Sequence, residues 1–178
     1  MRKNLAILGS TGSIGTQALE VVDAHPHLFN VTVLSGHSNS ALLTEQALKF
    51  QPEAVVVTDT AAYEKVKNNL GHTAIRVMEG QEALCEAVQW DTVDFVLAAI
   101  VGFAGLHSTL AAVRAGKQVG VANKETLVVA GALITEAAGK HNSMLVPVDS
   151  EHSALFQCLT GENYGDIEKI ILTASGGP

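Results

Sequence analysis

Two carboxylates, Asp149 and Glu151, lie two residues apart in the stretch Pro-Val-Asp-Ser-Glu-His at residues 147–152. In an extended backbone, residues i and i+2 point to the same side, so both carboxylates would face one point. Such a pair of hard oxygen ligands suits Mg²⁺ or Mn²⁺, which keeps open positions for a substrate. The same residues are also typical of a helix start, with Asp149 or Ser150 as the cap and Glu151 in the first turn. Spacing alone leaves both interpretations open.

Glycines near the start of the chain suggest a second kind of chemistry. In LAILGSTGSIGTQALEVV, residues 5–22, an apolar run leads through Gly9, Gly12 and Gly15 into a helix-like repeat. We expect these glycines to allow a tight turn, close approach of a ligand and packing of the helix on the sheet, respectively. The first N–H groups of the helix would then bind a nucleotide diphosphate. Three hydroxyl donors lie in the same loop: Ser10, Thr11 and Ser13. The spacing is GxxGxxG instead of the usual GxGxxG, so a turn without a ligand is the alternative.

The residues after the second predicted strand bear on which nucleotide is bound. In NAD-binding proteins of this type, a carboxylate about 20 residues past the glycine loop accepts a ribose hydroxyl. Residues 36–39 read Gly-His-Ser-Asn and contain no carboxylate that would repel a 2′-phosphate. His37, Ser38 and Asn39 can each donate a hydrogen bond to such a phosphate. This favours NADP over NAD, although no Arg or Lys is present. The alternative is that Ser38 or Asn39 caps the next helix.

Three more segments follow predicted strands, where open α/β sheets bind their ligands. Asn123-Lys124-Glu125 brings a lysine toward a substrate phosphate or hydroxyl, or simply starts a helix. Residues 173–177, Thr-Ala-Ser-Gly-Gly, have the small side chains of an oxyanion or phosphate loop, or of a plain turn. Residues 98–105, AAIVGFAG, are either a ligand-facing strand end or a place of close packing.

A regular succession of strands and helices has to position these segments. Apolar runs of strand length alternate with helix-period segments, which predicts right-handed βαβ crossovers. The sequence therefore predicts an α/β fold with a Rossmann-like, doubly wound, mostly parallel sheet. The expected strands are residues 4–9, 29–35, 54–58, 74–78, 93–99, 118–122 and 143–148, with a further strand at 167–174. The expected helices are residues 13–24, 40–50, 60–70, 80–89, 104–115, 125–138 and 151–159.

Composition argues against several other classes of protein. The net charge is −7 and no basic run occurs, so we expect no nucleic-acid partner. No apolar stretch approaches the roughly 18 residues that span a bilayer, and the N-terminal apolar run is too short for a signal peptide. The two cysteines form no CxxC pair and the seven histidines form no HExxH motif, which argues against a disulfide framework or a zinc cluster. We therefore expect a cytoplasmic protein without a membrane partner.

Five motifs together resemble one enzyme family. GSTGSIG, AAIVGFAGL, ANKETLV, PVDSEHSA and LTASGGP are similar to the N-terminal part of the 1-deoxy-D-xylulose 5-phosphate reductoisomerases, and the resemblance covers essentially the whole chain. It implies an NADPH- and Mg²⁺- or Mn²⁺-dependent oxidoreductase and isomerase of non-mevalonate isoprenoid biosynthesis. The reaction would convert 1-deoxy-D-xylulose 5-phosphate, a phosphorylated sugar, to 2-C-methyl-D-erythritol 4-phosphate. Residues 1–149 would form the NADPH-binding domain, and residues 150–178 would begin an α+β catalytic domain.

The resemblance also implies roles for individual residues. The cofactor-binding residues would be Gly9, Thr11, Gly12, Ser13, Ile14, Gly36, His37, Asn39, Asn123 and Glu125. The metal ligands would be Asp149 and Glu151. The substrate-binding residues would be Lys124, Ser150, Glu151 and Ser175. The catalytic residues would be Lys124, Asp149 and Glu151. Many members have a basic residue where this chain has His37.

The chain stops at Ser-Gly-Gly-Pro soon after the last predicted strand, and we interpret it as a fragment of a longer enzyme. Family members draw a further carboxylate ligand, a flexible lid and the main substrate-phosphate site from sequence beyond this region. We therefore expect the fragment to turn over little or nothing, and the full-length enzyme to be a homodimer. Two alternatives are the NADP-binding module of another dehydrogenase and a non-catalytic nucleotide sensor. The former would need a cysteine nucleophile after a strand, whereas Cys85 lies in a helix-like segment.

Overall fold

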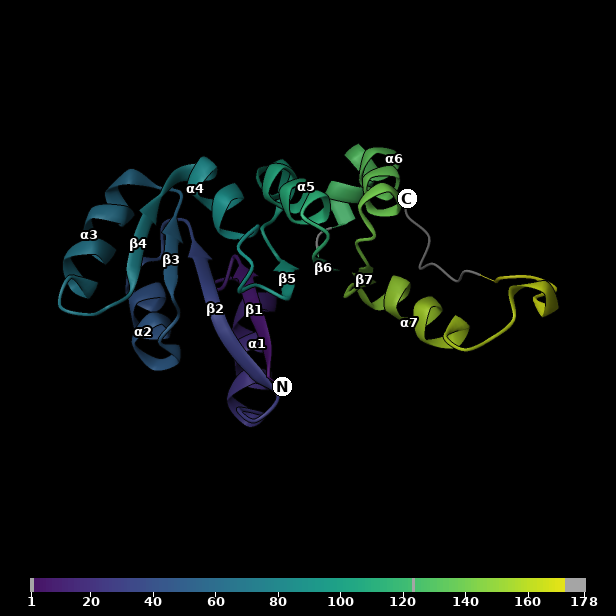
Figure 1. Cartoon of the computed structure of the whole chain (residues 1–178), viewed down its shortest axis with the longest axis horizontal. Coiled ribbons are helices and arrows are strands. Elements are labelled where there is room, and N and C mark those ends of the chain that lie inside the picture. The colour runs from purple at the N-terminus through teal and green to yellow at the C-terminus, as the bar shows by residue number, and fades with distance from the viewer. Residues whose placement is uncertain (1, 123, 172–178) are drawn as a thin grey trace, which may run out of the picture.

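A parallel β-sheet is the central element of the fold (Figure 1). The computed structural model describes residues 2–122 and 124–171, and in this part of the chain seven strands pair in the order β4-β3-β2-β1-β5-β6-β7. Every neighbouring pair is parallel. The strands are β1 (Lys3–Leu8), β2 (Phe29–Gly36), β3 (Ala54–Val57), β4 (Arg76–Glu79), β5 (Phe95–Ala98), β6 (Gln118–Val121) and β7 (Leu145–Pro147).

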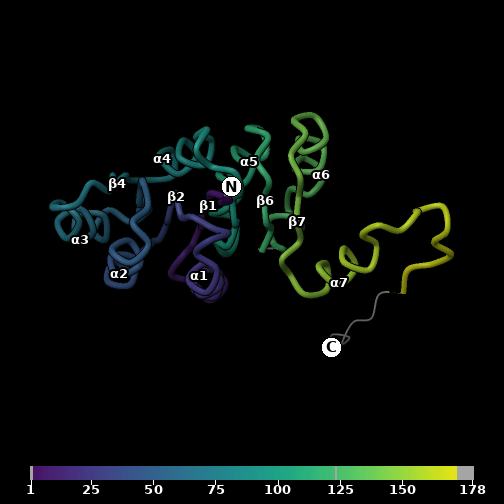
Figure 2. The backbone as a smooth tube through the Cα atoms, turned by 60° about the horizontal axis from the view of Figure 1, so that its bottom comes forward, coloured from purple at the N-terminus to yellow at the C-terminus, as the bar shows by residue number. Residues whose placement is uncertain are grey.

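Helices connect the strands and cover the faces of the sheet. Helices α1 to α3 lie on one face and α4 to α6 on the other, whereas α7 extends away from the sheet (Figure 2). The helices are α1 (Ser13–Ala24), α2 (Ser40–Phe50), α3 (Thr60–Leu70), α4 (Gly80–Ala87), α5 (Leu106–Arg114), α6 (Lys124–His141) and α7 (Ser150–Leu159). Two short 3₁₀ turns are η1 (Gly102–Gly105) and η2 (Tyr164–Asp166).

Alternate residues of the central strands build two separate hydrophobic cores. Ile7 belongs to the core beneath α1 to α3, whereas its neighbour Leu8 belongs to the core beneath α4 to α6. The strand β3 is buried along its whole length. A parallel strand that is covered on both faces needs apolar side chains at every position. This is why the predicted strands appear in the sequence as unbroken apolar runs.

The order of the strands reverses next to β1. The chain runs from β1 outward through β2, β3 and β4, and then returns to the other side of β1 as β5. The connections that leave β1 and β5 therefore go to opposite faces, which opens a crevice at the carboxyl ends of these strands. Two backbone hydrogen bonds join the segments that border this crevice. Ser10 N donates to Ser35 O at 2.8 Å, and Ala99 N donates to Leu8 O at 3.1 Å. The fold thus places the glycine loop beside the end of β5.

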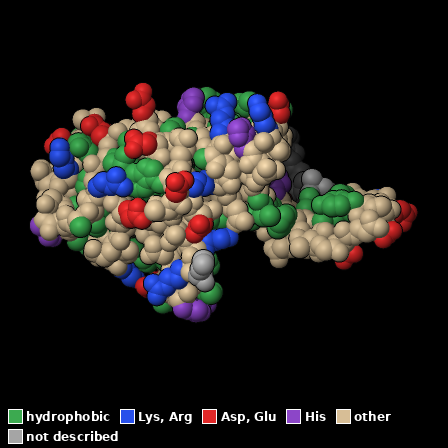
Figure 3. Space-filling model, in the orientation of Figure 1, with side chains coloured by type: hydrophobic (Ala, Val, Ile, Leu, Met, Phe, Trp, Pro, Cys, Tyr) green, Lys and Arg blue, Asp and Glu red, His purple; other side chains and the backbone are tan. Residues whose placement is uncertain are grey.

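The surface carries charges of both signs. On the face seen in Figure 3, Lys and Arg side chains are interspersed with Asp and Glu. Within the described ranges, no helix has both the length and the apolar character needed to cross a membrane. The two cysteines, Cys85 and Cys158, are free.

The predicted α/β architecture is confirmed, and the structure corrects one element. The seven strands expected between residues 4 and 148 and the seven expected helices all have counterparts, with ends that differ by a few residues. The strand expected at 167–174 is wrong in its described part, because residues 167–171 form no strand, and Ile170 and Ile171 are exposed. A strand is stabilised by hydrogen bonds to a neighbouring strand, and this segment pairs with none in the described chain. Residues 172–174 lie outside the described residues.

Candidate functional site

The glycine loop joins β1 to α1 as the sequence predicted. Gly9 has a φ of 76°, a left-handed conformation that turns the chain sharply at the end of β1. Gly15 is buried against the loop, and a Cβ there would collide with the Gly9 carbonyl and lie 2.5 Å from Ser10 Cα. Gly12 is the cap residue of α1 and makes no side-chain cap hydrogen bond. The positively polarised end of α1 is therefore not neutralised by a capping side chain, which suits it to an anion.

One expected hydroxyl donor of this loop points inward. Ser10 is fully buried, and its Oγ donates to Gln46 Oε1 at 2.7 Å and to the Ser35 carbonyl at 3.1 Å. Gln46 Nε2 donates back to the Ser10 carbonyl at 2.9 Å. The prediction that Ser10 donates to a ligand is therefore wrong, because its hydroxyl is used to join the loop to α2. Sequence reasoning missed Gln46, although a glutamine on the buried face of the predicted helix 40–50 was a usable signal.

A pocket of about 320 Å³ opens at the carboxyl ends of β1, β2, β3 and β5, where the strand order reverses. The predicted residues that line it are Gly9, Thr11, Gly12, Gly36 and His37. The segment 98–105 also reaches this pocket, through Ala99, Ile100, Val101 and Ala104. Ser35 and Thr58 line it as well, and sequence analysis did not single them out. Most of the lining side chains are small, so a ligand can come close to the backbone.

Ser35 and Thr58 hold two of the predicted residues in place. Ser35 Oγ accepts a hydrogen bond from Gly9 N at 3.1 Å, and Thr58 Oγ1 lies 3.0 Å from His37 Nδ1. Both stand at a strand's carboxyl end, so the rule that open α/β sheets bind ligands there could have found them. Asn39 Oδ1 accepts from Leu42 N at 3.2 Å as the cap of α2. The helix-cap interpretation is therefore confirmed for Asn39.

Other predicted cofactor residues lie around this pocket rather than in its lining. Ser13 and Ile14 form the start of α1, and the Ile14 side chain lines a groove on the α1 side of the sheet. Asn123 and Ser175, together with the rest of the 173–177 loop, lie outside the described residues.

The second part of the site lies at the carboxyl ends of β6 and β7. Lys124 is the first residue of α6, and Glu125 lies in its first turn. Asp149 is the cap residue of α7, and its Oδ1 accepts from Ser150 N at 3.1 Å. Ser150 Oγ in turn donates to Glu151 Oε2 at 2.8 Å. The helix-start interpretations of both segments are thus confirmed, and the extended backbone assumed for 149–151 is wrong because α7 begins at Ser150.

These polar groups interact across two helices. The pKa of Glu151 is lowered, first by the hydrogen bond from the Ser150 hydroxyl and then by the backbone N–H of Glu151 itself. The Lys124 cation and a hydrogen bond with the Asp149 side chain lower this pKa further. Because β7 pairs with β6, the start of α7 lies near the start of α6. The structure therefore brings together Lys124, Asp149 and Glu151, while no cluster of three or more His, Cys, Asp or Glu occurs in the described chain.

All seven strands in the described part of the chain are parallel, so the pocket and the acidic pair share one edge of the sheet. A doubly wound parallel sheet with a glycine loop at the point of strand reversal defines the Rossmann-like class of α/β proteins. Sequence models identify the family within this class. The model described as 1-deoxy-D-xylulose 5-phosphate reductoisomerase matches residues 5–131, and the model of that enzyme's C-terminal domain matches residues 145–178. The chain belongs to the 1-deoxy-D-xylulose 5-phosphate reductoisomerase family.

Individual relatives agree with this assignment. The 1-deoxy-D-xylulose 5-phosphate reductoisomerase of Bacteroides fragilis is 53% identical over 177 residues, which are 99% of this chain and 46% of the relative. The chain thus spans less than half the length of the curated relatives it matches and corresponds to their N-terminal part.

Solved reductoisomerases share the fold. The Zymomonas mobilis enzyme in complex with NADPH is 39% identical with a TM-score of 0.85, covering 89% of this chain and 41% of that chain. A reductoisomerase in complex with NADPH, fosmidomycin and magnesium is 40% identical with a TM-score of 0.85, covering 88% of this chain and 38% of that chain.

Proposed function

We propose that this chain supplies the NADPH-binding part and the first metal ligands of a reductoisomerase that converts 1-deoxy-D-xylulose 5-phosphate to 2-C-methyl-D-erythritol 4-phosphate. The reaction would belong to non-mevalonate isoprenoid biosynthesis. The observation that carries the proposal is the pocket at the strand reversal, next to the uncapped start of α1, in a chain of this family. A solved relative is described as a complex with NADPH.

The pocket residues fit a dinucleotide. Gly15 lets α1 approach β1 so closely that no larger residue would fit, which directs the start of the helix at the pocket. Thr11 and Gly12 would hold the diphosphate, with Ser13 and Ile14 contributing from the first turn of α1. On the adenosine side, no Asp or Glu lines the pocket in the described chain. Its polar side chains there are hydroxyls and His37, which favours the 2′-phosphate of NADPH.

The acidic pair fits a divalent cation. Mg²⁺ is commonly bound through one or two carboxylates and keeps several waters, and Asp149 and Glu151 supply such a pair at the start of α7. The pKa of Glu151 is lowered by the Ser150 hydroxyl, which favours the charged carboxylate that a cation needs. When bound, the cation would polarise the carbonyl and hydroxyl oxygens of the substrate and stabilise negative charge that develops on them. Lys124 places a cation beside the same point, and Ser150 would contact the substrate.

The whole reaction requires more than these residues. We assign residues 1–149 to the cofactor domain and residues 150–178 to the beginning of the catalytic domain. Two exposed or half-exposed carboxylates alone bind a cation weakly, so we expect the 178-residue chain to bind NADPH but to turn over little or nothing. A cytoplasmic location and a homodimeric state belong to this proposal for the full-length enzyme. Ser175 and Asn123 keep their proposed substrate and cofactor roles there.

The alternative that this chain belongs to another NADP-dependent dehydrogenase is not favoured. That class would need a cysteine nucleophile after a strand. Cys85 lies in α4, and partial burial raises the pKa of its thiol. A thiol with a raised pKa is a poor nucleophile at neutral pH.

Cofactor titration tests the proposal. Nicotinamide fluorescence during titration of the chain should give a dissociation constant for NADPH at least about tenfold below that for NADH. His37→Ala should narrow this difference, whereas His72→Ala, which replaces an exposed histidine in the loop after α3, should leave it unchanged. Equal affinities for the two nucleotides would remove the NADPH assignment, and no binding of either would overturn the proposal.

The catalytic part needs a complete enzyme. A chimera can join residues 1–178 to the part of the Bacteroides fragilis reductoisomerase that follows the matched region. In this chimera, Glu151→Gln should abolish turnover of 1-deoxy-D-xylulose 5-phosphate while leaving NADPH binding intact. Full turnover by Glu151→Gln would exclude the metal-ligand role.

A further inference from the structure

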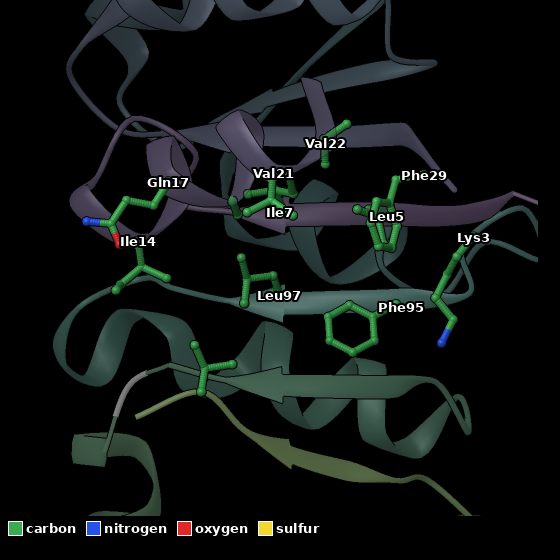
Figure 4. A pocket seen from close by; sticks show the side chains of 12 residues that line it. Lys3, Leu5, Ile7, Ile14, Gln17, Val21, Val22, Phe29, Phe95 and Leu97 are labelled. Atoms are coloured by element: carbon green, nitrogen blue, oxygen red, sulfur yellow. The ribbon is translucent and has the colours of Figure 1, made fainter. Parts of the chain in front are cut away.

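One face of the sheet is only partly covered by helices. Helices α1 to α3 pack over β1 to β4, but on this side the described chain places no helix over β5, β6 and β7 (Figure 2). The uncovered part forms a groove of about 530 Å³ beside α1. Side chains of β1 and β5, including Ile7 and Leu97, form its floor, and α1 forms one wall (Figure 4).

The groove is apolar along most of its length. Val21 of α1 is 52% exposed and faces it, and Val148 at the end of β7 is 37% exposed at its far edge. The Phe95 ring extends the floor over β6, where a Cβ on Gly120 would lie 2.7 Å from Phe95 Cζ. Parallel sheets are normally covered on both faces, and an exposed apolar patch of this kind marks an interaction site.

The only charged side chain in the described lining lies at one end of the groove. Lys3 Nζ donates to Gln118 Oε1 at 2.6 Å and lies 5.6 Å from the centre of the Phe95 ring. Lys3 begins β1, so this end of the groove is the amino end of the strands. A helix that packs antiparallel to the strands, as α1 does, would end there. A cation beside the carbonyl end of a helix is favourable.

Two observations bear on what could cover this groove. The chain corresponds to the N-terminal 46% of its Bacteroides fragilis relative, so more than half of that enzyme is polypeptide outside the present structure. In addition, Val148 lines the groove and immediately precedes the residues that start α7, so the chain leaves the sheet at the edge of the groove. The rest of the relative's polypeptide is thus joined to the sheet through α7, which leaves from the edge of this groove.

We propose that the groove is the docking surface for an amphipathic helix from the C-terminal half of the same reductoisomerase chain. The six-residue strand β1 is about 20 Å long at 3.3 Å per residue, which a helix of about 13 residues would match. This helix turns an apolar stripe toward Val21, Phe95 and Leu97 and ends near Lys3. The assignment rests on membership of the family and does not depend on which nucleotide the pocket binds.

The chimera described above tests the proposal against the 178-residue chain. Amide hydrogen exchange of α1 should be at least about tenfold slower in the chimera than in the chain alone, whereas exchange of α2 should change little. Val21→Asp should lower the thermal unfolding midpoint of the chimera by several degrees and leave that of the chain nearly unchanged. The matched control is Leu48→Asp, because Leu48 is 43% exposed on α2 and lies outside the groove. Leu48→Asp should change the thermal unfolding midpoints of the chimera and of the chain by similar amounts.

Three results would overturn the proposal. Unchanged exchange of α1 in the chimera would show that the C-terminal half does not cover the groove, and this measurement needs no variant. If Val21→Asp and Leu48→Asp lower the thermal unfolding midpoint of the chimera equally, the C-terminal half likewise does not cover the groove. A dimer of the 178-residue chain in sedimentation that Val21→Asp dissociates would identify a second copy as the occupant. NADPH titration of Val21→Asp should match the unmodified chain, so failure of the docking proposal is distinct from failure of the proposed function.

Discussion

Replacement of Gly15 by alanine should damage both the stability of the fold and the nucleotide pocket. The added Cβ would collide with the Gly9 carbonyl and lie 2.5 Å from Ser10 Cα. These neighbours are backbone atoms, so rotation of a side chain cannot relieve the overlap, and α1 has to move away from β1. Overpacking of this kind costs about 1–3 kcal/mol. The better helix propensity of alanine offsets up to about 1 kcal/mol of this cost.

Gly139→Ala is the matched control for this substitution. Gly139 also lies in a helix, α6, but a Cβ there would meet nothing within 4 Å. The control should therefore gain about 0.5–1 kcal/mol in the free energy of unfolding. Urea unfolding of the two variants should differ by about 2 kcal/mol in favour of Gly139→Ala.

The same pair of variants also tests the pocket. A shift of α1 would displace the first N–H groups of the helix from the proposed diphosphate position, so Gly15→Ala should weaken NADPH binding about tenfold or more, a change of about 1.4 kcal/mol. Gly139→Ala should bind NADPH like the unmodified chain. If Gly15→Ala proves as stable as Gly139→Ala and binds NADPH with unchanged affinity, the close approach of α1 to β1 does not build the site.

Two further substitutions test the supports of the site. Gln46→Ala removes both hydrogen bonds between α2 and buried Ser10 and should cost about 1–2 kcal/mol in urea unfolding, since the Ser10 carbonyl loses its donor while the Ser10 hydroxyl keeps the Ser35 carbonyl as a partner; a loss below that of an ordinary surface substitution would argue against this role. Ser150→Ala removes the main cause of the lowered Glu151 pKa, so carboxyl NMR should show Glu151 titrating at higher pH, toward its ordinary value of 4.5. The stabilisation from the depressed pKa is present above the unfolded value and is lost as pH falls through the folded value. An unshifted titration would show that the hydroxyl does not act on Glu151.

Local patterns were sufficient to predict the glycine loop and the helix starts. The tight turn at Gly9, the packing of Gly15 and the cap at Asn39 each depend on residues within a few positions of one another. The α/β order followed from the alternation of apolar runs, and the parallel sheet followed from the length of the crossovers. The predicted cofactor loop and acidic pair are on the same edge of the sheet because parallel strands all end there.

Contacts between distant segments were not predictable in the same way. The inward turn of Ser10 depends on Gln46, which is 36 residues away in the sequence. The strand expected at 167–174 has the right residue types, but a strand also needs a neighbour, and residue types do not show one. The open groove beside α1 was likewise hidden, because Phe95 and Leu97 appear in the sequence as ordinary core residues of a buried strand.

The two parts of the site differ in how much of their surroundings the described chain supplies. The nucleotide pocket is enclosed by four strand ends, and its supporting residues Ser10 and Ser35 are buried. The acidic pair lies at the start of α7, where Glu151 is exposed and water screens its charge. The proposed interactions of a cation and a substrate with these carboxylates would be stronger where water is excluded. Cofactor binding should therefore be a property of this chain alone, whereas the chemistry proposed for Asp149 and Glu151 should need further polypeptide that shields the start of α7 from water.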